Sequence, residues 1–164
     1  DGDENFHVYA VELMGGDGRD YTPFEGVRGG LVATDQKRPN EILVELNARQ
    51  RETFDVYRLQ LETGALVLDT ENPGDVVGWL QDDAFNVRLG QVSTPDGGTE
   101  LRVRDDVKSP WRSWMKVGPT EILSALEFTK DGKSLFIQSS IGSDTARVVE
   151  RPTASAPPVV RKPW

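Results

Sequence analysis

The sequence contains no cysteine and only one histidine among its 164 residues. The absence of cysteine excludes a disulfide framework, a thiol nucleophile, a thiolate zinc site and an iron–sulfur cluster. Any chemistry must therefore come from oxygen-bearing groups and a single imidazole. We predict that the chain binds no cofactor.

Long apolar runs and excess positive charge are also missing. No run approaches the roughly 18 apolar residues of a membrane span, and the acidic opening at residues 1–5 lacks the basic and apolar regions of a signal peptide. Nineteen Lys and Arg against 27 Asp and Glu leave a net charge of −8, which repels phosphate backbones and anionic lipids. We expect a soluble, cytoplasmic chain that binds neither nucleic acid nor membrane.

Helical periodicity is scarce, and short alternating runs take its place. Residues 7–13 and 55–61 alternate between apolar and polar side chains, and a glycine-containing turn follows each, at 14–18 and 62–65. Such runs, bounded by Gly, Pro, Asn and Asp, are typical of antiparallel hairpins. The sequence therefore predicts an all-β fold.

A repeat runs through the chain. Windows 30–47, 76–93 and 123–140 align without a gap at offsets of 76 − 30 = 46 and 123 − 76 = 47 residues. Each window has a short apolar run, a polar turn and a longer apolar run, and the column Leu43, Leu89, Phe136 suits a buried face. With the hairpin that follows, the unit is four antiparallel strands, the content of one β-propeller blade.

The repeat predicts a β-propeller segment of about three blades, built from four-stranded antiparallel sheets, over residues 1–151. Its parts are an outer hairpin at 6–22, a blade at 30–70, a blade at 76–117 and a partial blade at 123–150. Residues 152–164, with their several prolines, are predicted to form a tail. A β-sandwich with evenly spaced strands is the alternative.

No catalytic constellation can be found in the sequence. His7 falls on a predicted strand, and no Gly-x-Ser-x-Gly elbow occurs, since Gly142 directly precedes Ser143. We therefore assign no catalytic residue.

Four oxygen ligands near the amino terminus, Asp1, Asp3, Asn5 and Glu12, match positions one, three, five and twelve of a calcium loop. Phe6 stands where that loop needs glycine, and the strand predicted over 7–13 would carry Glu12 away. We predict an acidic turn and no metal site.

Two further groups of residues have structural explanations. The pairs Asp82-Asp83 and Asp105-Asp106 lie in predicted turns, where Asp accepts hydrogen bonds from nearby backbone amides. Trp79, Trp111 and Trp114 could form a sugar platform, but packing is the commoner use of tryptophan in such a fold.

Seven short motifs occur in a specific order along residues 1 to about 150. They are Gly2–Asn5, His7–Tyr9, Arg19–Phe24, Leu46-Asn47 with Arg49, Asp55–Arg58, Leu61–Gly64 and Asp144–Arg147. In this order they resemble the amino-terminal propeller of bacterial prolyl oligopeptidase-family serine peptidases of the acylaminoacyl peptidase and dipeptidyl aminopeptidase types.

The resemblance implies a non-catalytic role. In that family the propeller caps an α/β-hydrolase domain that holds the catalytic residues, and it limits access to short peptides. The expected partners are such a hydrolase domain of the same protein and short peptides, and the open ends of a partial propeller make self-association possible. A stand-alone propeller-like interaction scaffold is the alternative function.

Overall fold

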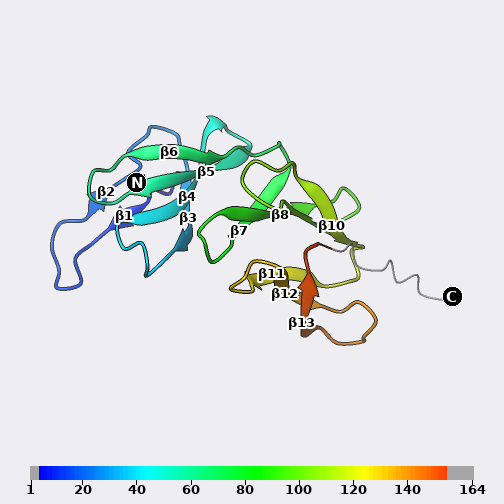
Figure 1. Cartoon of the computed structure of the whole chain (residues 1–164). Helices are drawn as coiled ribbons and strands as arrows, with labels where there is room; N and C mark the ends of the chain where they lie inside the picture. Colours follow the sequence, from blue (N-terminus) through cyan, green and yellow to red (C-terminus); the bar gives the residue numbers. More distant parts are fainter. Residues whose placement is uncertain (1–3, 155–164) are drawn as a thin grey trace. The chain divides into compact units, whose positions relative to one another are not determined.

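The computed structural model describes residues 4–154 (Figure 1). Within this range the chain forms thirteen strands in four antiparallel sheets and no helix. The predicted all-β class is therefore confirmed, and the fold is consistent with a β-propeller-like segment. The described residues contain no helix long and apolar enough to cross a membrane.

The chain divides into two compact units, Asp1–Gly74 and Asp75–Trp164. The first unit holds a two-stranded sheet and a four-stranded sheet, here called the N-terminal sheet, in the order β3-β4-β5-β6. Its strands are β1 (Tyr9–Ala10), β2 (Arg19–Asp20), β3 (Gly29–Thr34), β4 (Glu41–Gln50), β5 (Thr53–Gln60) and β6 (Leu66–Thr70).

Strand β4 is the central element of the first unit. Its apolar residues alternate between the two faces, and both faces are covered, since Leu43 and Val44 are each fully buried. Val44 and Leu46 pack with Leu59 of β5, and side chains that include Val8 of the amino-terminal segment cover this cluster. Burial of one such leucine or valine contributes about 2 kcal/mol, so these contacts hold the amino-terminal segment on the sheet.

The second unit contains a four-stranded sheet, here called the central sheet, and a three-stranded C-terminal sheet in the order β11-β12-β13. The strands of the central sheet are β7 (Val76–Gln81), β8 (Val87–Ser93), β9 (Thr99–Val103) and β10 (Arg112–Val117). The strands of the C-terminal sheet are β11 (Leu123–Phe128), β12 (Ser134–Ser139) and β13 (Arg147–Pro152).

One hydrophobic core joins these two sheets. The central sheet contributes Leu89, Leu101 and Trp114 among others, and the C-terminal sheet contributes Leu135 and Ile137, which are fully buried. The two sheets of the second unit therefore share the apolar surface that stabilises each of them.

The three aligned windows all form antiparallel hairpins, β3-β4, β7-β8 and β11-β12. The expected buried column is only partly correct. Leu43 and Leu89 are buried, but Phe136 is half-buried because β12 turns its neighbours Leu135 and Ile137 into the core instead.

The strand predicted over residues 7–13 is wrong in its length. Only Tyr9 and Ala10 pair with β2, and the side chains of residues 9–19 are exposed. The alternating pattern is present, but the described part of the chain does not cover its apolar face.

The last strand also extends past residue 150, where the partial blade was predicted to end. β13 begins at Arg147 and continues through Pro152, the first residue of the predicted tail. Proline is tolerated there because β13 is an edge strand, and the amide that proline lacks can face away from β12. Thr153 is buried, and its amide donates to the carbonyl of Lys133 at 2.9 Å. The rest of the predicted tail, from residue 155, lies outside the described residues.

Candidate functional site

The single histidine lies at the base of the β1-β2 hairpin and pairs with an aspartate. His7 Nδ1 lies 2.7 Å from Asp20 Oδ2, and the His7 ring stacks on Tyr9 with 6.1 Å between ring centroids. Partial burial opposes ionisation of Asp20, but hydrogen bonds from His7 and from the Thr22 amide lower its pKa below the ordinary value. The pair is thus a carboxylate that orients an imidazole.

Such a pair supplies two of the three groups of a serine hydrolase. Tyr9 also hydrogen-bonds the Asp20 carboxylate through its side chain, and the one aliphatic hydroxyl beside the pair, that of Thr22, is buried and accepts a hydrogen bond from the Val8 amide at 2.8 Å. A hydroxyl held in this way stabilises backbone and is closed to substrate. The hydrogen bonds of His7 and Asp20 therefore hold the base of the hairpin together.

The calcium-loop residues can be placed only in part. Asp1 and Asp3 lie outside the described residues, and Glu12 is exposed in the loop that follows β1. Among residues 4–154 no three His, Asp or Glu side chains are grouped so that they could hold a metal ion.

The first Asp pair lies in a turn, as predicted. Asp82 Oδ1 accepts hydrogen bonds from the amides of Ala84 and Asn86, both at 3.0 Å. In the same turn Phe85 has a positive φ of 67°, which is uncommon for a residue other than glycine, and its buried ring offsets this cost. These contacts fix the position of the Asp82 carboxylate.

The second Asp pair, Asp105-Asp106, also lies in a turn. Asp106 Oδ1 accepts from the amides of Lys108 and Ser109, both at 2.8 Å, and these hydrogen bonds lower the pKa of its carboxyl group. Asp105 pairs with Arg112 at 3.1 Å.

The three tryptophans do not form a common platform. Trp114 is buried in the core, and its Nε1 donates to the Pro152 carbonyl at 3.2 Å, so its predicted packing role is confirmed. Trp79 and Trp111 are half-buried and lie 5.8 Å apart between centroids at an angle of 46°. The guanidinium of Arg104 lies over the Trp111 ring at 4.5 Å.

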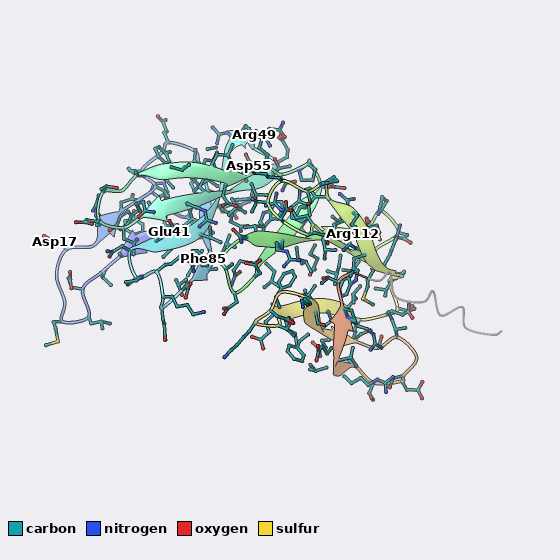
Figure 2. All side chains as sticks on the ribbon, in the orientation of Figure 1. Asp17, Glu41, Arg49, Asp55, Phe85 and Arg112 are labelled. Carbon is teal, nitrogen blue, oxygen red and sulfur yellow. The ribbon has the colours of Figure 1, made fainter. Side chains whose placement is uncertain are left out.

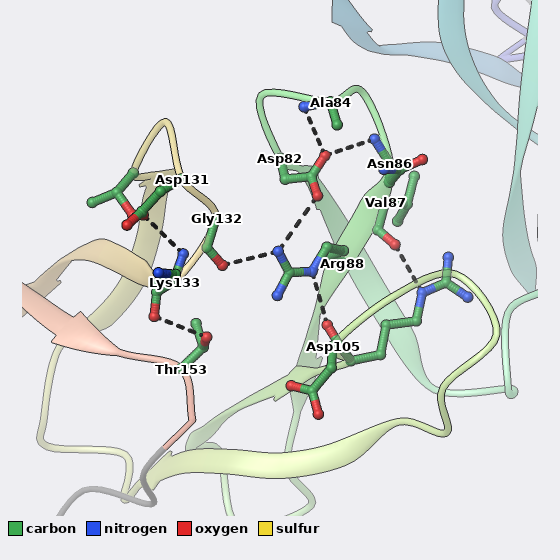
Figure 3. Close-up of polar contacts among 12 residues, drawn as sticks. Asp82, Ala84, Asn86, Val87, Arg88, Asp105, Asp131, Gly132, Lys133 and Thr153 are labelled. Carbon is green, nitrogen blue, oxygen red and sulfur yellow. Dashed lines mark hydrogen bonds and ion pairs between the residues drawn. The ribbon is translucent and has the colours of Figure 1, made fainter.

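Two buried arginines, which the sequence reasoning missed, organise the second unit (Figure 3). Arg88 Nε donates to the Arg104 carbonyl at 3.0 Å, and Arg104 Nε donates to the Val87 carbonyl at 2.8 Å. Arg88 Nη1 also donates to the Gly132 carbonyl at 2.9 Å and lies 3.4 Å from Asp82 Oδ2. Because Gly132 belongs to the β11-β12 turn, Arg88 joins the central sheet to the C-terminal sheet.

A second arginine–carboxylate group, also missed, stabilises the first unit (Figure 2). Arg49 donates to both carboxylate oxygens of Asp55 at 2.8 Å, and the Asn72 amide donates to Asp55 Oδ1 at 2.7 Å. Burial alone would raise the pKa of Asp55, but these hydrogen bonds outweigh it and lower the pKa. Asp55 is therefore a buried carboxylate that stays ionised.

A sequence signal for both groups was available. Arg88 and Asp55 stand inside apolar strand runs, where a charged residue requires a partner if it is buried. The identity of that partner depends on which turn or strand lies beside it, and this is a property of the folded sheets.

Comparison with known proteins gives one relative. The chain is 31% identical over 156 residues to dipeptidyl aminopeptidase BIII of Pseudoxanthomonas mexicana, and the match covers 94% of this chain but only 22% of that protein. No family model and no solved structure matches the chain. The chain is thus a distant homologue of one part of a peptidase.

Proposed function

We propose that the chain is a non-catalytic propeller portion of a serine peptidase of the prolyl oligopeptidase family. In this role it gates and positions short peptide substrates for an α/β-hydrolase domain of the same protein. The observation that carries the proposal is the match of nearly the whole chain to about a fifth of a dipeptidyl aminopeptidase.

The sheet organisation supports the same proposal. The N-terminal and central sheets each consist of four strands consecutive in sequence and antiparallel, which is the make-up of a propeller blade. In the proposal β3–β6 and β7–β10 are two blades, and β11–β13 are three strands of a third.

The polar groups of the chain also suit a non-catalytic part. The imidazole of His7 is engaged with Asp20, and the buried carboxylate of Asp55 is neutralised by Arg49. These groups stabilise hairpins and sheets, so hydrolysis in the proposed enzyme belongs to another domain.

A chimera tests this function. The aligned segment of the Pseudoxanthomonas mexicana enzyme is replaced by this chain, and hydrolysis of peptides of increasing length is compared with that of a variant lacking the segment. We expect the chimera to cleave short peptides and to exclude long ones. Substrates with a free and with an acetylated amino terminus distinguish the dipeptidyl aminopeptidase type from the acylaminoacyl peptidase type.

The melting temperature of the chain within the chimera gives a second measure. We expect it to exceed that of the isolated chain, because neighbouring blades bury apolar faces. A folded chimera whose hydrolysis depends on peptide length in the same way as that of the deletion variant, with no gain in melting temperature, would contradict the proposal. This result would favour a stand-alone scaffold.

A further inference from the structure

Asp-Gly pairs occur at 17–18, 96–97 and 131–132 among the described residues, and a further pair, Asp1-Gly2, lies outside them. In such a pair the backbone nitrogen of the glycine can attack the side-chain carboxyl carbon of the aspartate and close a succinimide ring. Glycine favours this step, because it has no Cβ to hinder the approach and permits a wide range of backbone torsions. The reaction requires that the glycine amide and the carboxylate are both free to move.

The pair at 131–132 is held in the β11-β12 turn (Figure 3). The Gly132 amide donates to the Thr129 carbonyl at 2.7 Å, and Asp131 Oδ1 accepts from the Thr129 hydroxyl at 2.7 Å and from the Lys133 amide at 3.1 Å. The hydrogen bond from Thr129 lowers the pKa of Asp131, so the protonated carboxyl group, which loses water most readily, is scarcer. Both reacting groups of this pair are therefore occupied.

The pair at 96–97 is held in the same manner, in the loop between β8 and β9. The Gly97 amide donates to the Thr94 carbonyl at 2.8 Å, and Asp96 Oδ1 accepts from the Thr94 hydroxyl. That hydroxyl hydrogen bond lowers the pKa of Asp96. In these two turns the Asp side chain stabilises the backbone, which is its common role.

The pair at 17–18 has none of these constraints. It lies in the loop between β1 and β2, where Figure 2 labels Asp17, and every residue from 11 to 18 is exposed. The turn hydrogen bond of this loop, from the Gly15 amide to the Glu12 carbonyl, ends before the pair. Among the described residues neither the Asp17 carboxylate nor the Gly18 amide has a hydrogen-bond partner. A backbone without such contacts opens at little cost in free energy.

We propose that Asp17-Gly18 is a site where aspartate converts spontaneously to isoaspartate. The Gly18 nitrogen bonds to Asp17 Cγ, while the amide proton and the carboxyl hydroxyl leave together as one molecule of water. Water then adds to either carbonyl of the ring. Attack at Cγ restores aspartate, and attack at the α-carbonyl carbon breaks its bond to the nitrogen, so the main chain now runs through Cγ. The step needs no oxidant or cofactor and does not depend on the proposed function.

The product changes both the hairpin and the surface of the loop. Isoaspartate adds one methylene to the main chain just before Arg19, which donates to the carbonyls of Leu61 and Glu62 at 3.1 and 3.2 Å. It also leaves a free α-carboxylate at residue 17. That carboxylate is the group to which an isoaspartyl methyltransferase adds the methyl of S-adenosylmethionine, and the exposed loop leaves it accessible.

Prolonged incubation of the folded chain in neutral buffer tests the proposal. Methylation by an isoaspartyl methyltransferase with labelled S-adenosylmethionine measures total isoaspartate, and electron-transfer fragmentation of peptides locates it and separates Asp17 from Asp1. We expect isoaspartate to form about tenfold faster at Asp17 than at Asp96 or Asp131, the effect of a net hydrogen bond that must break before the ring closes. In chain unfolded by urea, the rates at these positions should become similar.

Two variants separate the loop from the turns. Gly18→Ala should slow the reaction at Asp17 several-fold, since a Cβ hinders ring closure and would lie 3.2 Å from the side chain of Val11, which is exposed and can move. Thr129→Ala is the matched control: it frees the Asp131 carboxylate, so isoaspartate should increase there and stay unchanged at Asp17. Circular dichroism checks that each variant is folded.

Three results would overturn the proposal. The first is a folded chain that forms no isoaspartate at Asp17. The second is a folded chain that forms it equally fast at Asp17, Asp96 and Asp131. The third is an unfolded chain in which Asp17 keeps its tenfold lead, because the difference would then come from the neighbouring sequence and not from the fold.

Discussion

The carboxylate of Asp55 has no exposed surface and is bound by both the Arg49 guanidinium and the Asn72 amide. Asp55→Asn keeps the shape of the side chain but removes its charge. We expect a loss of about 2 kcal/mol in the free energy of unfolding, measured in urea, because a buried ion pair has lost one partner. Asp144→Asn, at an exposed position, should cost nothing measurable.

The same residue makes stability depend on pH. The pKa of Asp55 is lower in the folded chain than its ordinary value, so its contribution is complete above the pKa of an unfolded Asp. It is lost as the pH falls through the folded pKa. The difference in unfolding free energy between wild type and Asp55→Asn should therefore shrink between pH 7 and about pH 3. A constant difference would show that the charge of Asp55 contributes nothing.

Gly98, directly before β9, is fixed by a close backbone approach. A Cβ atom there would lie 2.2 Å from the Val117 carbonyl oxygen, whereas a Cβ at Gly118 would meet nothing within 4 Å. We expect Gly98→Ala to destabilise the chain by about 3 kcal/mol, the upper end of the cost of forced repacking. Gly118→Ala should be close to neutral. Thermal unfolding of both variants measures the difference, and equal destabilisation by the two substitutions would contradict the steric explanation.

At the scale of elements, Arg88 is the link between two sheets. Arg88→Met removes the donors to the Gly132 and Arg104 carbonyls, and we expect a loss of about 2–3 kcal/mol. Hydrogen exchange should accelerate in β11–β13 more than in β3–β6, which lie in the other unit. Arg88→Lys keeps the charge but not the forked geometry and should be intermediate. Uniform acceleration in both units would argue against a local link.

The strands themselves were predictable because their alternating runs end at strong turn residues. The three aligned windows each form a hairpin for this reason, and Gly132 has the positive φ that its turn requires. The buried arginines could not be paired with their acceptors from sequence, because Gly132 lies 44 residues from Arg88. The strand predicted over residues 7–13 was too long, because an alternating pattern indicates one covered face but does not identify the surface that covers it.

At the scale of the whole molecule, we expect the isolated chain to hydrolyse no peptide, acyl-peptide or ester substrate. His7 orients toward Asp20, and the nearby Thr22 hydroxyl is buried. Chromogenic assays of wild type and His7→Ala should give the same blank rate. Turnover that disappears in His7→Ala would assign catalysis to this chain.

The order of the strands in the three larger sheets has a consequence for folding during translation. In the N-terminal, central and C-terminal sheets every strand pairs with the strand before or after it in sequence. Each ladder can therefore close over a short loop, which favours rapid folding. As the chain leaves the ribosome, each new strand directly follows its partner in sequence, so the sheets can form in chain order.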